Sequence, residues 1–101
     1  MDIAVQRDYL PNHFNSGFFL ARSNERSLEA FLMMFNITES LRDDQEAFNQ
    51  VIHGSEVIGL EVVELPDNHF PCGRKYFEDF GIHFGEDIEK NQEAYMVHNN
   101  W

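Results

Sequence analysis

Between residues 28 and 35, four large apolar side chains recur at the spacing of one helical face. They are Leu28, Phe31, Leu32 and Phe35. Positions i, i+3, i+4 and i+7 lie on the same side of an α-helix, so we expect an amphipathic helix here. Two apolar runs of strand length, 3–6 and 17–21, precede it and are separated by a turn-forming segment at 11–13. Two strands followed by such a helix predict a layered α/β fold.

Capping residues give the expected starts of two helices. Ser23 is the candidate N-cap of the first, and Glu25 suits the positive end of its dipole. Asp43 and Glu46 form a pair like a capping box at the start of the second, and Gly54 is its expected stop. Apolar residues then lie on one side of this second helix. They are Phe48, Val51 and Ile52.

The second half of the chain is rich in β-branched and aromatic residues. Residues 57–65 predict a strand that ends at Pro66, and residues 95–98 predict a last short strand. Between them we expect a long aromatic loop region, punctuated by Pro71, Gly73, Gly81 and Gly85. The expected order is strand, strand, helix, helix, strand, loop, strand, without an internal repeat or linker. We therefore predict a mixed sheet with flanking helices in a single α/β unit over residues 1–101.

Composition excludes several classes of function. Eighteen Asp and Glu against seven Lys and Arg give a net charge of −11, which would repel a phosphate backbone, so we expect no nucleic-acid partner. No apolar run reaches the roughly 18 residues of a membrane segment. The acidity suits binding of a divalent cation, although exposed carboxylates are ordinary surface residues. Cys72 stands alone, so it has no disulfide partner in this sequence.

Three polar segments could carry chemistry, and each also has a plain structural interpretation. Asn15, Ser16 and Gly17 could bind a sugar, or could form a turn before a strand. Asp44 and Gln45 could contact a substrate, or could occupy the first turn of a helix, where a carboxylate compensates the dipole. The imidazole of residue 98 could bind a metal, or could be half-buried and hydrogen-bonded to the backbone.

Taken in order, these segments resemble the nucleotide-diphospho-sugar transferase family, and in particular the plant-type xylosyl- and arabinosyltransferases with a GT-A fold. The similar stretches are Asn15-Ser16-Gly17-Phe18-Phe19, Asp44-Gln45-Glu46-Ala47-Phe48-Asn49 and Val97-His98-Asn99-Asn100-Trp101. Residues 2–8, 70–73 and 76–77 also match segments of this family. The resemblance thus extends over nearly the whole chain.

The resemblance implies a transfer of sugar from a nucleoside-diphosphate donor to a glycan acceptor, with retention of configuration. It implies that Asn15, Ser16 and Gly17 line the sugar site and that Asp44 and Gln45 contact donor or acceptor. The matching histidine, His98, is expected to bind a divalent metal, manganese (Mn²⁺). The family also implies a Golgi enzyme whose catalytic part faces the lumen. Phe70 and Phe77, in the aromatic loop, are expected to serve packing.

Two parts of the family pattern are missing from this sequence. No two Asp residues stand at Asp-X-Asp spacing, the motif that supplies the main metal carboxylates, and the Gly and Lys that follow the histidine motif would lie beyond Trp101. We therefore expect residues 1–101 to be the C-terminal portion of a GT-A catalytic domain, a fragment that is inactive alone. The competing hypothesis is a small acidic α/β module that binds or scaffolds without catalysis.

Overall fold

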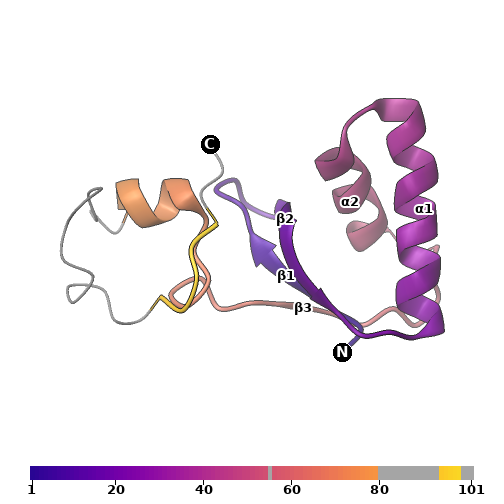
Figure 1. Cartoon of the computed structure of the whole chain (residues 1–101), viewed down its shortest axis with the longest axis horizontal. Coiled ribbons are helices and arrows are strands. Elements are labelled where there is room, and N and C mark those ends of the chain that lie inside the picture. Colours follow the sequence, from indigo (N-terminus) through magenta and orange to yellow (C-terminus); the bar gives the residue numbers. More distant parts are fainter. Residues whose placement is uncertain (55, 80–93, 99–101) are drawn as a thin grey trace.

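A mixed three-stranded sheet with two helices packed beside it forms the main body of the structure (Figure 1). The structure, a computed structural model, describes residues 1–54, 56–79 and 94–98. Its elements are β1 (Ile3–Arg7), β2 (Phe14–Ala21), α1 (Glu25–Leu41), α2 (Asp44–His53), β3 (Val62–Glu64) and a short π-helix, η1 (Lys75–Asp79). The predicted α/β class and mixed sheet with flanking helices are confirmed. Within the described ranges, no helix has the length and apolar character needed to cross a membrane.

The central strand β1 is antiparallel to β2 on one side and parallel to β3 on the other. Its pairing with β2 is interrupted, because Val5 lies opposite Phe19 whereas Gln6 lies opposite Asn15. Residues 16–18 of β2 thus bulge out of the regular ladder. A bulge bends its strand and redirects side chains. Here it contains Ser16 and Gly17, two of the residues predicted to line a sugar site.

The helix α1 begins one residue later than predicted. Asn24, not Ser23, is the N-cap: its side-chain oxygen accepts a hydrogen bond from the Ser27 backbone N–H at 2.9 Å. Both residue types cap helices well, so sequence alone did not separate them. Glu25 lies in the first turn, as expected.

The apolar face predicted for α1 is largely not the face that the core buries. Leu28, Leu32 and Phe35 are 61%, 57% and 63% exposed, and only Phe31 of the predicted set packs against the core. The buried positions are instead Ser27, Ala30 and Met34. Ser27 and Ala30 have small side chains, which allow α1 to approach its neighbours closely. The larger apolar groups consequently lie on the outer side of the helix.

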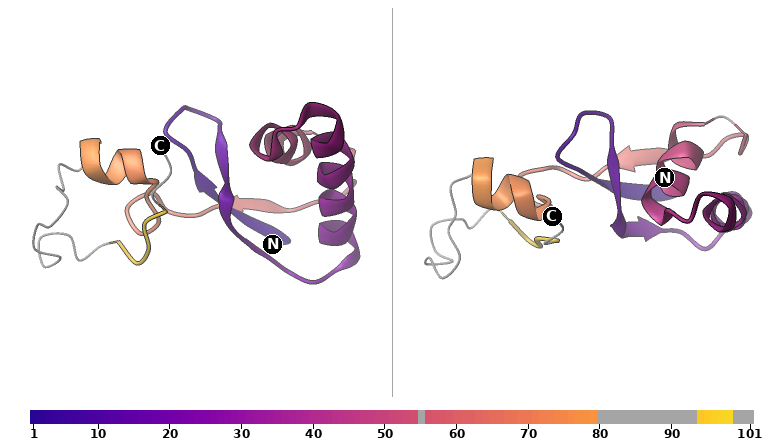
Figure 2. Two further views of the ribbon diagram at one scale, coloured as in Figure 1. Left: turned by 45° about the horizontal axis from the view of Figure 1, so that its top comes forward. Right: turned by 90° about the horizontal axis from the view of Figure 1, so that it is seen from above.

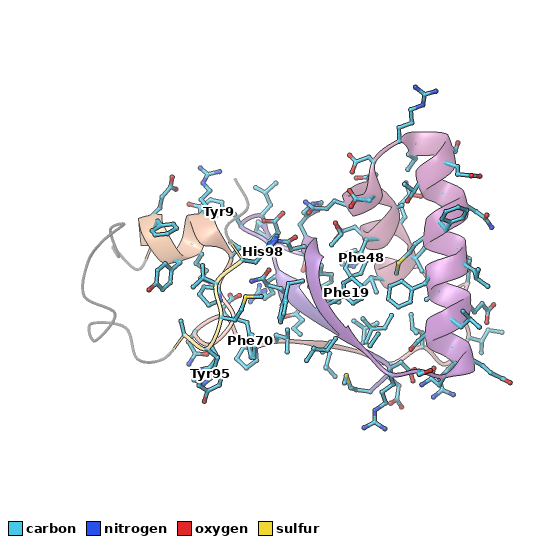
Figure 3. All side chains as sticks on the ribbon, in the orientation of Figure 1. Tyr9, Phe19, Phe48, Phe70, Tyr95 and His98 are labelled. Carbon is cyan, nitrogen blue, oxygen red and sulfur yellow. The ribbon has the colours of Figure 1, made fainter. Side chains whose placement is uncertain are left out.

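The second helix and the core agree with the sequence. Asp43 caps α2 by accepting from the Glu46 N–H at 3.1 Å, and Gly54 ends it. Phe19 of β2 packs against Phe31 and Phe48, with ring centroids 5.2 Å and 5.5 Å away, so that it joins the sheet to both helices (Figure 3). The buried core is a single cluster of Ile3, Val5, Phe14, Ala30, Met34, Phe48, Val51, Ile52 and Val57.

The strand predicted at 57–65 is shorter than expected, because only Val62–Glu64 pairs with β1. Gly59 has a φ of 78°, and the Leu60 N–H bonds to the Val57 carbonyl at 3.3 Å, so the run begins with a turn. The last predicted strand, 95–98, is reduced to one parallel bridge between His98 and Cys72.

The segment that contains η1 lies on the side of the β1–β2 hairpin opposite the two helices (Figures 1 and 2). Gln6, fully buried in β1, holds this segment by donating its side-chain amide to the carbonyls of Phe70 and Pro71 at 3.1 Å and 3.0 Å. Phe70 also stacks on Phe18, and the ring of Phe77 meets that of Tyr76 edge-on. The packing role predicted for Phe70 is therefore confirmed, whereas the ring contact of Phe77 is with its own chain neighbour and its packing role stays a prediction. Part of the predicted loop forms the π-helix η1, and its later part, from residue 80 on, lies outside the described residues.

Candidate functional site

The bulge of β2 brings together the three segments that the sequence singled out. The Asn15 side-chain nitrogen, Nδ2, lies 2.9 Å from Nδ1 of His98, although the two residues are 83 positions apart. One residue along, the Ser16 hydroxyl points at the Asp44 carboxylate, with an Oγ–Oδ2 distance of 3.5 Å. The His98 ring thus lies beside one end of the bulge and the start of α2 beside the other.

Ser16 and Asp44 share a hollow of about 240 Å³ between β2, α1 and α2. Thr38 is its third polar lining residue, and its other walls are apolar: Phe19, Phe31, Met34, Phe35 and Phe48. Small-molecule sites commonly occupy about 300 to 1,000 Å³; this hollow lies below that range, so it could take only a part of a sugar donor, such as one sugar ring. A carboxylate and a hydroxyl beside aromatic faces match the hydroxyls and the C–H face of such a ring.

The side chain of Gln45 contacts the turn between β1 and β2. Its amide nitrogen, Nε2, lies 3.0 Å from the Asp8 carboxylate and 3.0 Å from Nε2 of His13. A carboxylate can only accept, so the contact with Asp8 fixes the amide nitrogen toward the turn and leaves the carbonyl oxygen of Gln45 to accept from a hydroxyl. Asp44, beside it, is exposed in the first turn of α2. Because Asp43 already caps the helix, Asp44 is not needed for that purpose.

Gly17 is the residue against which the His98 ring packs. A Cβ built on Gly17 would lie 2.7 Å from Nε2 of His98 and closer still to Cε1, nearer than real Cβ atoms approach other heavy atoms. The glycine φ is not positive, so the reason for glycine here is space, not backbone conformation. The family resemblance implied that Gly17 lets the backbone approach a sugar. In the structure the His98 ring lies in the space beside Gly17.

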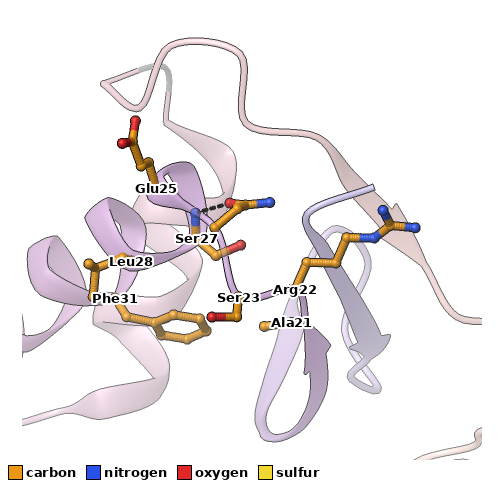
Figure 4. A pocket seen from close by; sticks show the side chains of 8 residues that line it. Ala21, Arg22, Ser23, Glu25, Ser27, Leu28 and Phe31 are labelled. Atoms are coloured by element: carbon orange, nitrogen blue, oxygen red, sulfur yellow. Dashed lines mark hydrogen bonds between the residues drawn. The ribbon is translucent and has the colours of Figure 1, made fainter.

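Two other features near the site do not offer chemistry. Cys72 is buried and forms the parallel bridge with His98, and burial raises the pKa of its thiol, so the side chain stays a neutral packing group. A larger hollow of about 520 Å³ lies at the start of α1 (Figure 4). None of the predicted site residues lines it, and Asn24 in its wall already accepts a hydrogen bond from the Ser27 N–H as the helix cap.

Comparison with known protein families identifies the family to which this chain belongs. The family model described as nucleotide-diphospho-sugar transferase matches residues 2–101. The chain belongs to the nucleotide-diphospho-sugar transferase family. Neither the search of curated proteins nor that of solved structures gave a match. Family membership implies a GT-A-like fold and a role with a sugar donor and acceptor.

The described residues do not by themselves assemble a metal site. No group of three His, Cys, Asp or Glu residues is placed to hold an ion in the described part of the chain. His98, the predicted ligand, has one ring nitrogen against Asn15 and the other beside Gly17. The remaining residues of its motif, Asn99, Asn100 and Trp101, lie outside the described residues. The metal role of His98 and the manganese ion thus stay predictions.

Sequence analysis did not identify several residues that line or support the candidate site. Asp8 and His13 hold Gln45. Asp8 ends the family-like segment 2–8 and His13 belongs to the predicted turn, but this turn meets α2 only in the fold, so neither residue was assigned to the site. Thr38 and Phe35 line the hollow from α1. Phe35 was expected in the core but is widely exposed, and the helical spacing of apolar residues could not predict this exposure.

Proposed function

We propose that this protein takes part in transfer of a sugar from a nucleoside-diphosphate donor to a glycan, with Ser16 and Asp44 holding one sugar ring. The observation that carries the proposal is their shared hollow, in which two segments 28 residues apart present a hydroxyl and a carboxylate beside aromatic walls. This is the place where the family resemblance had put the sugar. Asn15 and Gly17 shape the adjoining bulge, and Gln45 offers its carbonyl oxygen.

The chemistry asked of these residues is mainly positioning and electrostatics. A bound sugar donor must be held so that an acceptor hydroxyl reaches the anomeric carbon, and charge develops as the diphosphate departs. The exposed carboxylate of Asp44 can accept hydrogen bonds from sugar hydroxyls and stabilise positive charge at the anomeric carbon. A divalent metal, when bound, would neutralise the diphosphate. The described residues include no group of three His, Cys, Asp or Glu side chains placed to hold that ion.

The finer assignments come from the resemblance alone. We propose that the chain is the C-terminal portion of a GT-A catalytic domain of the plant xylosyl- and arabinosyltransferase type. We also propose that the intact protein uses manganese and works on the lumenal side of the Golgi. An Asn36-Ile37-Thr38 sequon on α1 is compatible with that compartment.

Donor binding to single variants tests the sugar site. Titration calorimetry with UDP-xylose, UDP-arabinose and UDP-galactose should detect binding of at least one, weakened about tenfold or more in Asp44→Asn, because hydrogen bonds to charged groups contribute about 1.5 to 3 kcal/mol. Glu46→Gln is the matched control, since it removes a carboxylate from the same helical turn but not from the hollow. Equal affinities for both variants would favour the non-catalytic acidic module.

A further inference from the structure

The Asn15 side chain contacts the Gly17 backbone N–H and the His98 ring, and these two contacts fix the orientation of its amide. Its Oδ1 accepts a hydrogen bond from the Gly17 backbone N–H at 2.8 Å. A backbone N–H can only donate, so the amide oxygen must point toward Gly17 and the amide nitrogen must point away. That nitrogen, Nδ2, faces Nδ1 of His98 at 2.9 Å. Asn15 is only 2% exposed, so water does not replace either contact.

The orientation of Asn15 determines the tautomer of His98. The Nδ2 group can only donate, so Nδ1 of His98 must accept and cannot carry a proton. In a neutral imidazole one ring nitrogen carries the hydrogen, and here it is Nε2. Among the described residues, none hydrogen-bonds to Nε2 of His98, and that edge of the ring lies beside the exposed Gly17.

This tautomer suits a hydrogen-bond donor and does not suit a metal ligand. A metal needs the lone pair of Nε2, which the proton occupies. To free it, the Asn15 amide would have to turn over, and the Gly17 N–H would then face a second donor instead of an acceptor. An N–H at Nε2 can instead bond to an anionic oxygen, and such bonds are stronger than neutral ones.

We propose that Asn15, anchored on the Gly17 N–H, keeps His98 protonated at Nε2 so that His98 donates a hydrogen bond to a diphosphate oxygen of the sugar donor. The proposal rests on the proposed function for the nature of the ligand. Asn15 is then a positioning residue that acts through His98, and Gly17 provides both the anchor and the space for the ring. The direct metal contact expected for His98 is the competing assignment.

Long-range ¹H–¹⁵N NMR of the His98 ring in the full chain, at a pH where imidazoles are neutral, reads the tautomer directly. We expect the proton on Nε2 in the native protein. In Asn15→Asp the carboxylate can accept from both Gly17 N–H and Nδ1–H, so the proton should move to Nδ1. Asn12→Asp is the matched control, because it adds the same charge in the β1–β2 turn and should leave the ring unchanged.

Two titrations, followed on the His98 ring resonances, distinguish a hydrogen-bond donor to diphosphate from a metal ligand. Inorganic pyrophosphate should shift the Nε2 resonance of the native protein, and Mn²⁺ should broaden the His98 ring only in Asn15→Asp, with affinity raised about tenfold or more. A native proton on Nδ1, selective Mn²⁺ broadening of native His98, or no response of Nε2 to pyrophosphate would each overturn the proposal. The native spectrum decides even if Asn15→Asp fails to fold. Sugar binding at Asp44, measured separately, judges the proposed function.

Discussion

Asn49 of α2 bonds to the main chain of Phe14 in both directions, as a neighbouring strand would. Its Oδ1 accepts from the Phe14 N–H at 2.8 Å, and its Nδ2 donates to the Phe14 carbonyl at 2.8 Å. The same Nδ2 reaches the carbonyl of Gln45 at 2.9 Å. One buried side chain thus fixes the start of β2 against α2, and the bulge that follows Asn15 takes its position from this contact.

Replacing Asn49 by Ala should destabilise the fold, because it removes the contact that holds the start of β2 against α2. Both main-chain groups of Phe14 would lose their partners inside the protein, and each unpaired buried group costs about 1 to 3 kcal/mol. We expect a loss of about 2 to 4 kcal/mol in the free energy of unfolding, measured with urea. Asn36→Ala, an exposed asparagine on α1, should change it by less than about 0.5 kcal/mol. Similar small losses in both would show that the Asn49 contact is not structural.

A second buried polar residue, Asp2, should make stability depend on acid pH. Its carboxylate accepts from both Arg26 and Asn24 side chains and from the Glu61 N–H. These donors, Arg26 above all, hold the pKa of Asp2 well below its usual range. The unfolded chain therefore binds this proton more readily, so the stabilisation is complete above the unfolded pKa of about 3.9 and declines as pH falls below it.

The variant Asp2→Asn tests that dependence. It should be less stable than the native chain at pH 7, and the difference should shrink as urea unfolding is repeated at pH values from 5 down to 3. Glu29→Gln removes an exposed carboxylate from α1 and serves as the control for net charge. A difference between Asp2→Asn and native protein that stays constant over this range would contradict the account.

The contact between Gly17 and His98 predicts a coupled pair of substitutions. Gly17→Ala places a methyl group where the imidazole lies, which should cost about 1 to 3 kcal/mol of stability or displace the ring. In a His98→Ala background the space is empty, so the same glycine substitution should cost little. A double-mutant cycle by urea unfolding measures this coupling. An unchanged cost of Gly17→Ala without His98 would place the strain elsewhere.

The sequence predicted the parts of the fold whose signals are local. The caps of α2 at Asp43 and Gly54 depend on neighbouring residues, and both are confirmed. The buried face of α1 was predicted wrongly, because its apolar side chains occur on more than one side and only tertiary contacts choose among them. The turn at Gly59 did have a local signal, a glycine inside an apolar run, which should have shortened the predicted strand.

The site was predictable as a set of residues but not as a geometry. The family resemblance named Asn15, Ser16, Asp44 and His98. The fold places Asn15 against His98 and Ser16 against Asp44. No sequence pattern could give the orientation of the Asn15 amide, because it depends on a main-chain donor two residues away and a ring 83 residues away. The tautomer of His98 follows from that orientation.

The most direct test of the central claim is to map the backbone amide shifts of the labelled chain while UDP-xylose, UDP-arabinose or UDP-galactose is added. The account predicts that the perturbed amides cluster at residues 15–17 and 44–45, around the hollow of Ser16 and Asp44, for at least one donor. Perturbations confined to residues 22–28, at the larger hollow beside the start of α1, would contradict it. So would a complete lack of response to all three donors.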